Sequence, residues 1–121
     1  MNDNHDLDKN EYLRGIRLFN EKKFFDAHEV LEDVWRAAPL ETKKFLQGLI
    51  QLAVAFHHHS KGNTVGAVSL LKRACRNLSP YPDGFAGIRV KPLLASVTAC
   101  AETLERGLPL AGIPRLDEPE C

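Results

Sequence analysis

Residues 45–56 constrain the fold more than any other stretch of this chain. They read Phe-Leu-Gln-Gly-Leu-Ile-Gln-Leu-Ala-Val-Ala-Phe, with two glutamines as the polar side chains. On a helix, the apolar positions of this stretch cover more than half of the circumference. Such a helix has to be surrounded by other elements, so the stretch predicts the central helix of a bundle. The apolar run is far shorter than the roughly 20 residues that a membrane span needs.

The rest of the chain predicts four further helices with short connections. Helical spacing of apolar residues places the five helices from about Asp8 to between Asn20 and Lys23, from Phe24 or Phe25 to Ala37, from Leu40 to Lys61, from Thr64 to Leu78, and from a first turn containing Pro92 to Gly107. Asp8 and Glu11 form an approximate capping box at the first start. Pro39 ends the second helix, and Gly62 ends the third. Residues 79–87 are rich in Pro and Gly, which predicts a constrained loop.

The predicted fold class is therefore all-α. We expect a compact multihelical bundle of about five helices, built from two helical hairpins plus a C-terminal helix, with a single domain over residues 1–107. Residues 108–121 form a Pro-rich tail that lies on its own bundle, docks on a partner or is disordered.

A weak internal repeat is visible at a shift of forty residues. Lys23, Ala27 and Leu31 align with the triplet Asn63, Ala67 and Leu71. Hairpins with a small residue on the second helix are typical of tetratricopeptide-type repeats. The simpler interpretation is that any antiparallel helix pair needs a small side chain where the two helices approach most closely.

Charge and cysteine content limit the classes of partner. Sixteen basic residues balance sixteen acidic ones, so no global field collects nucleic acid or an anionic membrane. The cysteines, Cys75, Cys100 and Cys121, are odd in number and widely spaced, which favours reduced thiols in a cytoplasm. Residues 1–11 are polar and acidic and contain no export signal. We therefore expect a cytoplasmic protein with no nucleic-acid or membrane partner.

The second predicted helix carries a pair of side chains suited to chemistry. His28 and Glu32 lie one helical turn apart and can reach each other or a shared ion, whereas Glu29 points about 100° away. The pattern His-Glu-x-x-Glu differs by one ligand from the zincin signature His-Glu-x-x-His. With His57 as a third ligand, the set His28, Glu32 and His57 would suit zinc, iron or manganese. Such a site would predict a metal-dependent hydrolase with Glu29 or a water as base.

Two further interpretations involve no metal. His57 lies in the middle of the apolar face of its helix, so we expect it to be buried with Glu32 as its partner. The side chains of His28, Glu32, Trp35 and His57 would then form a hydrogen-bonded lock between the second and third helices. Alternatively, Trp35, Gln47 and Gln51 orient a polar ligand in a metal-free pocket, to which His58 would also belong.

The motifs also resemble a known family. Ala27-His28-Glu29 with Glu32 and Trp35, followed by Leu46-Gln47-Gly48-Leu49-Ile50-Gln51 and His57, resembles the domain-of-unknown-function family 309 of small prokaryotic proteins over roughly residues 12–106. The resemblance implies a compact all-helical domain with no assigned activity, and it favours His57 over His58. The family typically shows a Gly-aliphatic-Asp-Val segment, for which this chain has Gly87-Ile88-Arg89-Val90, so no role of that acidic residue is carried over.

The function predicted first is therefore a binding or structural module. In this interpretation, the bundle presents an apolar groove to a protein partner or to a second copy of itself, using the tail and Phe85. The candidate cluster between the second and third helices comprises His28, Glu29, Glu32, Trp35, Gln47, Gln51 and His57.

Overall fold

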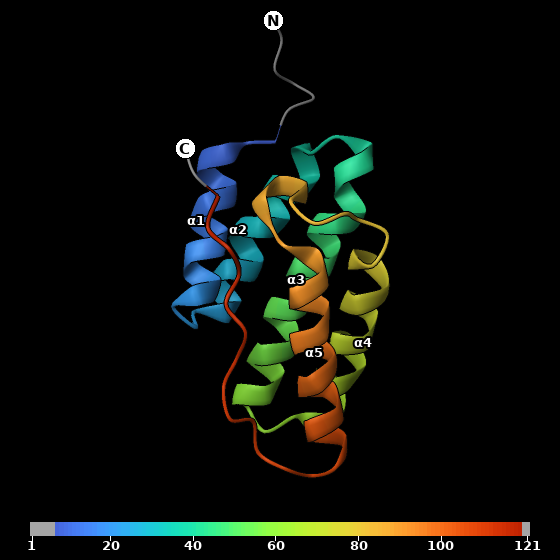
Figure 1. The fold of residues 1–121 in the computed structure, drawn as a ribbon. Coiled ribbons are helices and arrows are strands. Elements are labelled where there is room, and N and C mark those ends of the chain that lie inside the picture. The colour runs from blue at the N-terminus through green and yellow to red at the C-terminus, as the bar shows by residue number, and fades with distance from the viewer. Residues whose placement is uncertain (1–6, 120–121) are drawn as a thin grey trace, which may run out of the picture.

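The computed structural model describes residues 7–119, and within this range the regular structure is helical, which confirms the all-α class. The α-helices are α1 (Lys9–Asn20), α2 (Phe24–Ala37), α3 (Leu40–Ser60), α4 (Thr64–Leu78) and α5 (Val90–Glu105), with a short 3₁₀ turn η2 (Phe85–Gly87) before α5. Each expected helix is present within one or two residues of its predicted ends. Figure 1 shows α1 and α2 on one side of the bundle, and α4 and α5 on the other.

The third helix lies at the centre, as its apolar surface predicted. It packs against both α2 and α4, while α1 packs on α2 and α5 on α4. Phe45, Leu46, Leu49, Leu52 and Phe56 are all fully buried. Removing side chains of this size from water stabilises a fold by roughly 1.5–3 kcal/mol each. The positions of α2 and α4 therefore depend directly on α3, while α1 and α5 pack on α2 and α4.

Two close contacts fix α3 against its neighbours. At one end, the Phe56 ring packs with Phe19 of α1 and Phe24 of α2, with centroid separations of 6.0 and 5.7 Å. Nearer the other end, Gly48 faces α4. A Cβ atom on Gly48 would lie 2.6 Å from Cγ of Leu78, so only glycine permits this approach of the two helices.

The two helical hairpins share their turn geometry at a shift of forty residues. Between α1 and α2, the N–H of Lys23 donates to Leu18 O; between α3 and α4, the N–H of Asn63 donates to His58 O. The residue in the left-handed conformation is Lys22 in the first turn (φ 66°) and Gly62 in the second (φ 81°). The repeat seen in the sequence thus corresponds to one backbone turn used twice.

The start of α5 is capped by a residue that the sequence did not single out. Arg89 occupies the N-cap position and makes no side-chain cap. Instead, Asp83 of the preceding loop accepts a hydrogen bond from the N–H of Lys91 through Oδ1, at 2.7 Å. An acidic side chain near the first N–H groups of a helix stabilises it. The capping role that an acid at position 89 would have is therefore filled by Asp83 here.

The C-terminal tail lies on its own bundle as far as residue 119. Figure 1 shows it leaving the end of α5 and running back beside α1. Leu116 is buried in the core, at 2% exposure, and Asn20 of α1 binds its backbone. This is one of the three outcomes that the sequence left open. The export-signal prediction rests partly on residues 1–6, which lie outside the described range.

Two further sequence predictions concern thiols and membranes. Cys75 and Cys100 carry free thiols, and Cys121 lies outside the described residues. Among residues 7–119, none of the helices combines the length and the apolarity that a bilayer crossing requires.

The shared turn generates a prediction about stability. Lys22 holds a left-handed backbone that costs roughly 1–2 kcal/mol for a residue with a Cβ atom. We expect Lys22→Gly to raise the free energy of unfolding by about 0.5 kcal/mol, since the flexibility of glycine in the unfolded chain offsets part of the relief. The matched change Gly62→Lys should lower it by about 1 kcal/mol. Urea titration followed by circular dichroism measures both, and a loss of stability in Lys22→Gly would contradict the account.

Candidate functional site

His28 and Glu32 of α2 meet as the one-turn spacing predicted. Nε2 of His28 lies 3.3 Å from Oε2 of Glu32, and the two side chains are 22% and 41% exposed. Glu32 also lies 3.8 Å from the guanidinium of Arg36, one turn further along. Because the carboxylate of Glu32 is partly exposed to solvent and also faces the guanidinium of Arg36, its contact with His28 adds little to stability.

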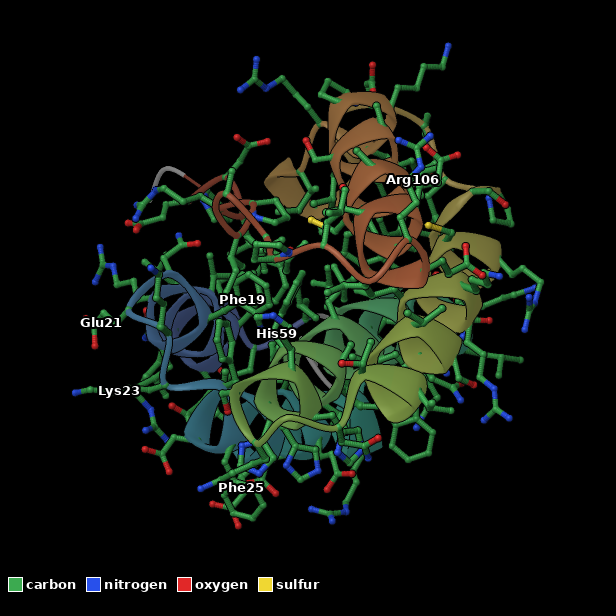
Figure 2. All side chains as sticks on the ribbon, turned by 90° about the horizontal axis from the view of Figure 1, so that it is seen from below. Phe19, Glu21, Lys23, Phe25, His59 and Arg106 are labelled. Atoms are coloured by element: carbon green, nitrogen blue, oxygen red, sulfur yellow. The ribbon has the colours of Figure 1, made fainter. Side chains whose placement is uncertain are left out.

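His57 does not take the position expected for it. It is half-buried rather than buried, and its ring packs 5.5 Å from the ring of Phe25. Phe25 in turn lies 5.4 Å from His28, so the half-exposed phenyl ring contacts both imidazoles. The physical reason is that the last turn of α3 faces the first turn of α2, where Phe25 projects from the bundle (Figure 2). Phe24, and not Phe25, is the first buried side chain of α2.

The described residues do not assemble a three-ligand metal set in this conformation. Within residues 7–119, no three His, Cys, Asp or Glu side chains come close enough together to hold an ion. His28 and Glu32 approach each other, whereas the ring contact of His57 is with Phe25. The metal set of His28, Glu32 and His57 therefore stays a prediction from the motif.

Trp35 lies two turns beyond His28 on the same side of α2. Nε1 of Trp35 and Nδ1 of His28 are both buried, and neither has a hydrogen-bond partner among the described residues. Lys43 of α3 covers the indole, with Nζ 4.4 Å from the ring centroid. The same ammonium donates to the backbone oxygens of Trp35 and Arg36 at 2.9 and 3.1 Å, which caps the end of α2. Within residues 7–119, the indole N–H is thus a donor without an acceptor at the seam between α2 and α3.

The two glutamines of the predicted cluster lie away from its other residues. Gln47 is exposed on α3. Gln51 turns toward α4, where its Oε1 accepts a hydrogen bond from Asn77 at 2.8 Å. The candidate cluster therefore divides into an α2–α3 seam with His28, Glu32, Trp35 and His57, and an α3–α4 contact made by Gln51.

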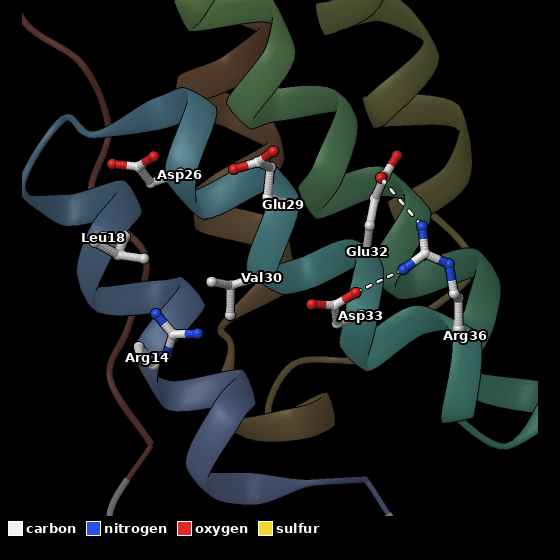
Figure 3. Close-up of a pocket in the computed structure, with 8 residues that line it drawn as sticks. All are labelled: Arg14, Leu18, Asp26, Glu29, Val30, Glu32, Asp33 and Arg36. Atoms are coloured by element: carbon white, nitrogen blue, oxygen red, sulfur yellow. Dashed lines mark hydrogen bonds and ion pairs between the residues drawn. The ribbon is translucent and has the colours of Figure 1, made fainter.

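An acidic groove between α1 and α2 is the polar site that sequence reasoning missed. The groove has a volume of about 500 Å³, and Figure 3 shows the carboxylates of α2 and the guanidinium of Arg14 from α1 around it. Its lining comprises Arg14, Leu18, Asp26, Glu29, Val30, Glu32, Asp33 and Arg36. The signal was in the sequence, because Asp26, Glu29 and Asp33 recur at helical spacing on the exposed face of α2.

The charges of the groove are only partly neutralised. Arg36 pairs with Asp33 at 2.6 Å and with Glu32 at 3.8 Å. The side chain of Arg14 donates a hydrogen bond to Glu11. This hydrogen bond is the main cause that raises the pKa of Arg14, and the charge of Asp33 makes a smaller contribution. Asp26 and Glu29 have no ion pair among residues 7–119. The groove therefore keeps an excess of negative charge.

Known proteins support the resemblance. The model of the family described as Domain of unknown function (DUF309) matches residues 12–70. An uncharacterized protein of Aquifex aeolicus (strain VF5) is 35% identical over 92 residues, which cover 75% of this chain and 28% of that relative. The uncharacterized protein YpuF of Bacillus subtilis (strain 168) is 41% identical over 69 residues, which cover 56% of this chain and 38% of that relative.

The matched segments thus span about a third of the length of these relatives. The matched residues 12–70 contain the His-Glu-x-x-Glu motif, Trp35, the central helix and His57, which are the positions that carried the resemblance. Residues 12–70 of this chain therefore match the family described as DUF309, a domain of unknown function.

Proposed function

We propose that this domain is a protein-binding module that holds a positively charged segment of a partner in the acidic groove between α1 and α2. The observation that carries the proposal is the pair Asp26 and Glu29, two exposed carboxylates that lie one turn apart in a groove of about 500 Å³ and have no ion pair among the described residues. Carboxylates of this kind attract lysine and arginine side chains and raise the rate of encounter with a basic partner.

The arrangement of the carboxylates favours a chain of separate charges over a single ion. Four acidic side chains line the groove, yet within residues 7–119 no three of them converge on one point. Asp26, Glu29 and Asp33 instead follow one another along α2 at a spacing of three to four residues. A basic helix or an extended Lys/Arg segment presents positive charges over such a length.

Apolar contact with the floor of the groove supports the same kind of partner. Val30, which is 6% exposed, and Leu18, which is half-buried, are the apolar residues of the lining and form a small apolar floor among charged side chains. The long methylene stems of Lys and Arg pack on such a floor while their charged ends reach the rim.

Removing the two free carboxylates tests the proposal. In the double variant Asp26→Asn/Glu29→Gln, we expect a fluorescein-labelled hexalysine peptide to bind roughly 3–30-fold more weakly. Each of the two exposed charge pairs that are lost contributes about 0.3–1 kcal/mol. The measurement is fluorescence anisotropy at low salt, with hexaglutamate as the negative probe. Binding should also weaken as ionic strength rises.

The matched control is Glu41→Gln/Glu102→Gln, which removes the same charge from exposed positions outside the groove. This variant should bind hexalysine as the wild-type chain does. Equal weakening in both double variants would show that net charge, and not the groove, attracts the peptide, and would overturn the proposal.

A second candidate function is a pocket for a small polar ligand at the seam between α2 and α3. It is favoured by Nε1 of Trp35 and Nδ1 of His28, because a buried polar atom without a partner costs roughly 1–3 kcal/mol that a ligand could recover. The metal-dependent hydrolase, with zinc, iron or manganese at His28, Glu32 and His57, is a prediction from the motif alone. The homo-oligomer and the cytoplasmic location are likewise predictions from the sequence.

Trp35 is the single tryptophan of the chain, so its fluorescence reports on this seam directly. If a polar ligand or a divalent ion enters the seam, we expect its addition to change the Trp35 emission with a saturable curve. Zinc, manganese and a panel of polar metabolites serve as probes, and His28→Ala should abolish the change. An emission spectrum that no probe alters in a saturable way would count against this second candidate.

A further inference from the structure

The tail crosses the bundle as an extended segment in a groove between α1 and α5. Residues 113–119 contain no helix, and Leu116 inserts into the core with 2% of its surface exposed. The prolines at positions 114 and 119 keep such a segment extended before it binds. The segment therefore has the shape of a bound peptide rather than of a helix that completes the bundle.

Asn20 of α1 recognises the backbone of this segment. Its Nδ2 donates to Leu116 O at 2.9 Å, and its Oδ1 accepts from the N–H of Leu116 at 2.8 Å. One carboxamide thus satisfies both polar backbone groups of one residue, as a neighbouring β-strand does for an extended chain. This contact requires an extended ligand and is independent of its side chains.

Backbone and side-chain groups of the groove bind the two residues after Leu116. The carboxylate of Asp117 accepts hydrogen bonds from the backbone N–H of Arg89, at 2.9 Å, and from its Nη2, at 3.3 Å. These hydrogen bonds lower the pKa of Asp117, and the bond from the backbone N–H of Arg89 contributes most. Glu118 lies 3.4 Å from Nε of Arg17 and 3.4 Å from Nδ2 of Asn20. The groove therefore matches a leucine followed by two acidic residues.

The surface that contacts Pro119, the fourth residue of this pattern, also fits its side chain. Pro119 packs on Gly87, where a Cβ atom would lie 2.9 Å from the proline ring. Gly87 also has a φ of 81°, which a side chain would strain. A cavity of about 140 Å³ lies between the tail and the start of α5, lined among others by Pro92, Ser96 and Leu116, so the segment is not packed as tightly as a core element.

The connection between α5 and this segment is exposed over much of its length. Leu108 is 52% exposed, Ala111 and Gly112 are exposed, and nothing lies within 4 Å of a Cβ atom built on Gly112. Leu110 and Ile113 pack, half-buried, on the core. The hydrogen bonds that hold the tail are concentrated in the sequence Leu-Asp-Glu-Pro.

We infer that the groove between α1 and α5 is a binding site for extended Leu-Asp-Glu-Pro-type segments. The chain's own tail occupies it, and the same segment of a second copy is its partner in trans. In the intact chain the tethered tail has an effective concentration on the order of millimolar, so it blocks the site until it is released. This site is separate from the acidic groove between α1 and α2 and does not depend on it.

The test uses the full chain, cut only after it has folded. A protease recognition sequence is inserted between the exposed residues Ala111 and Gly112, and the protein is cleaved in the native state. A fluorescein-labelled peptide with the sequence of residues 113–119 is then added and followed by anisotropy. We expect it to replace the cut tail in a saturable manner, and to bind the uncut chain at least tenfold more weakly.

Two variant peptides separate recognition from nonspecific adhesion. Leu116→Ala in the peptide should weaken binding at least tenfold, because the leucine side chain is the buried anchor. Arg115→Ala, at an exposed neighbouring position, should change it less than threefold, because the ion pair of Arg115 with Glu118, at 3.6 Å, is solvent-exposed and weak. Equal binding of all three peptides, failure of the labelled peptide to enter the cut chain, or equal binding to the uncut chain would each overturn the inference.

Loss of helical circular dichroism upon cleavage would also overturn it. In that case the tail would be a part of the folding core and not a ligand of a preformed groove.

Discussion

The burial of α3 is the interaction on which the rest of the structure depends. A helix with apolar residues around most of its circumference cannot stand at a surface, so two helical hairpins and a last helix have to share its faces. Phe56 joins the centre to α1 and α2, and Gly48 lets α4 approach closely. The polar side chains of the chain are consequently displaced to the seams and to the outer face of α2.

This displacement explains the character of the candidate sites. His28, Trp35 and His57 lie at the α2–α3 seam because the centre has no room for them, and Phe25 contacts the two imidazoles there. The outer face of α2 carries the carboxylates that form the acidic groove with α1. In both places the charged groups remain partly solvated, which suits recognition of a partner better than it suits stabilisation of the fold.

Sequence reasoning predicted what local periodicity determines. The helix ends, the N-cap at Asp8, the central position of α3 and the contact of His28 with Glu32 all follow from the spacing along single helices. The expected contact of His57 with Glu32 could not be derived from one helix, because it depends on how far α2 and α3 overlap. That overlap places Phe25 opposite His57. The direction of Gln51 toward Asn77 depends in the same way on a third helix. The position of the tail depends on Asn20 and Arg89, which no pattern within the tail reveals.

Native-state hydrogen exchange tests the central claim most directly. If the buried surface of α3 holds the bundle together, the amides of residues 45–56 should exchange last, at a rate set by global unfolding, after those of α1, α5 and the tail. Slower exchange in α1 or α5 than in α3 would contradict the account, since the surrounding helices would then be stable without the helix on which they are proposed to depend.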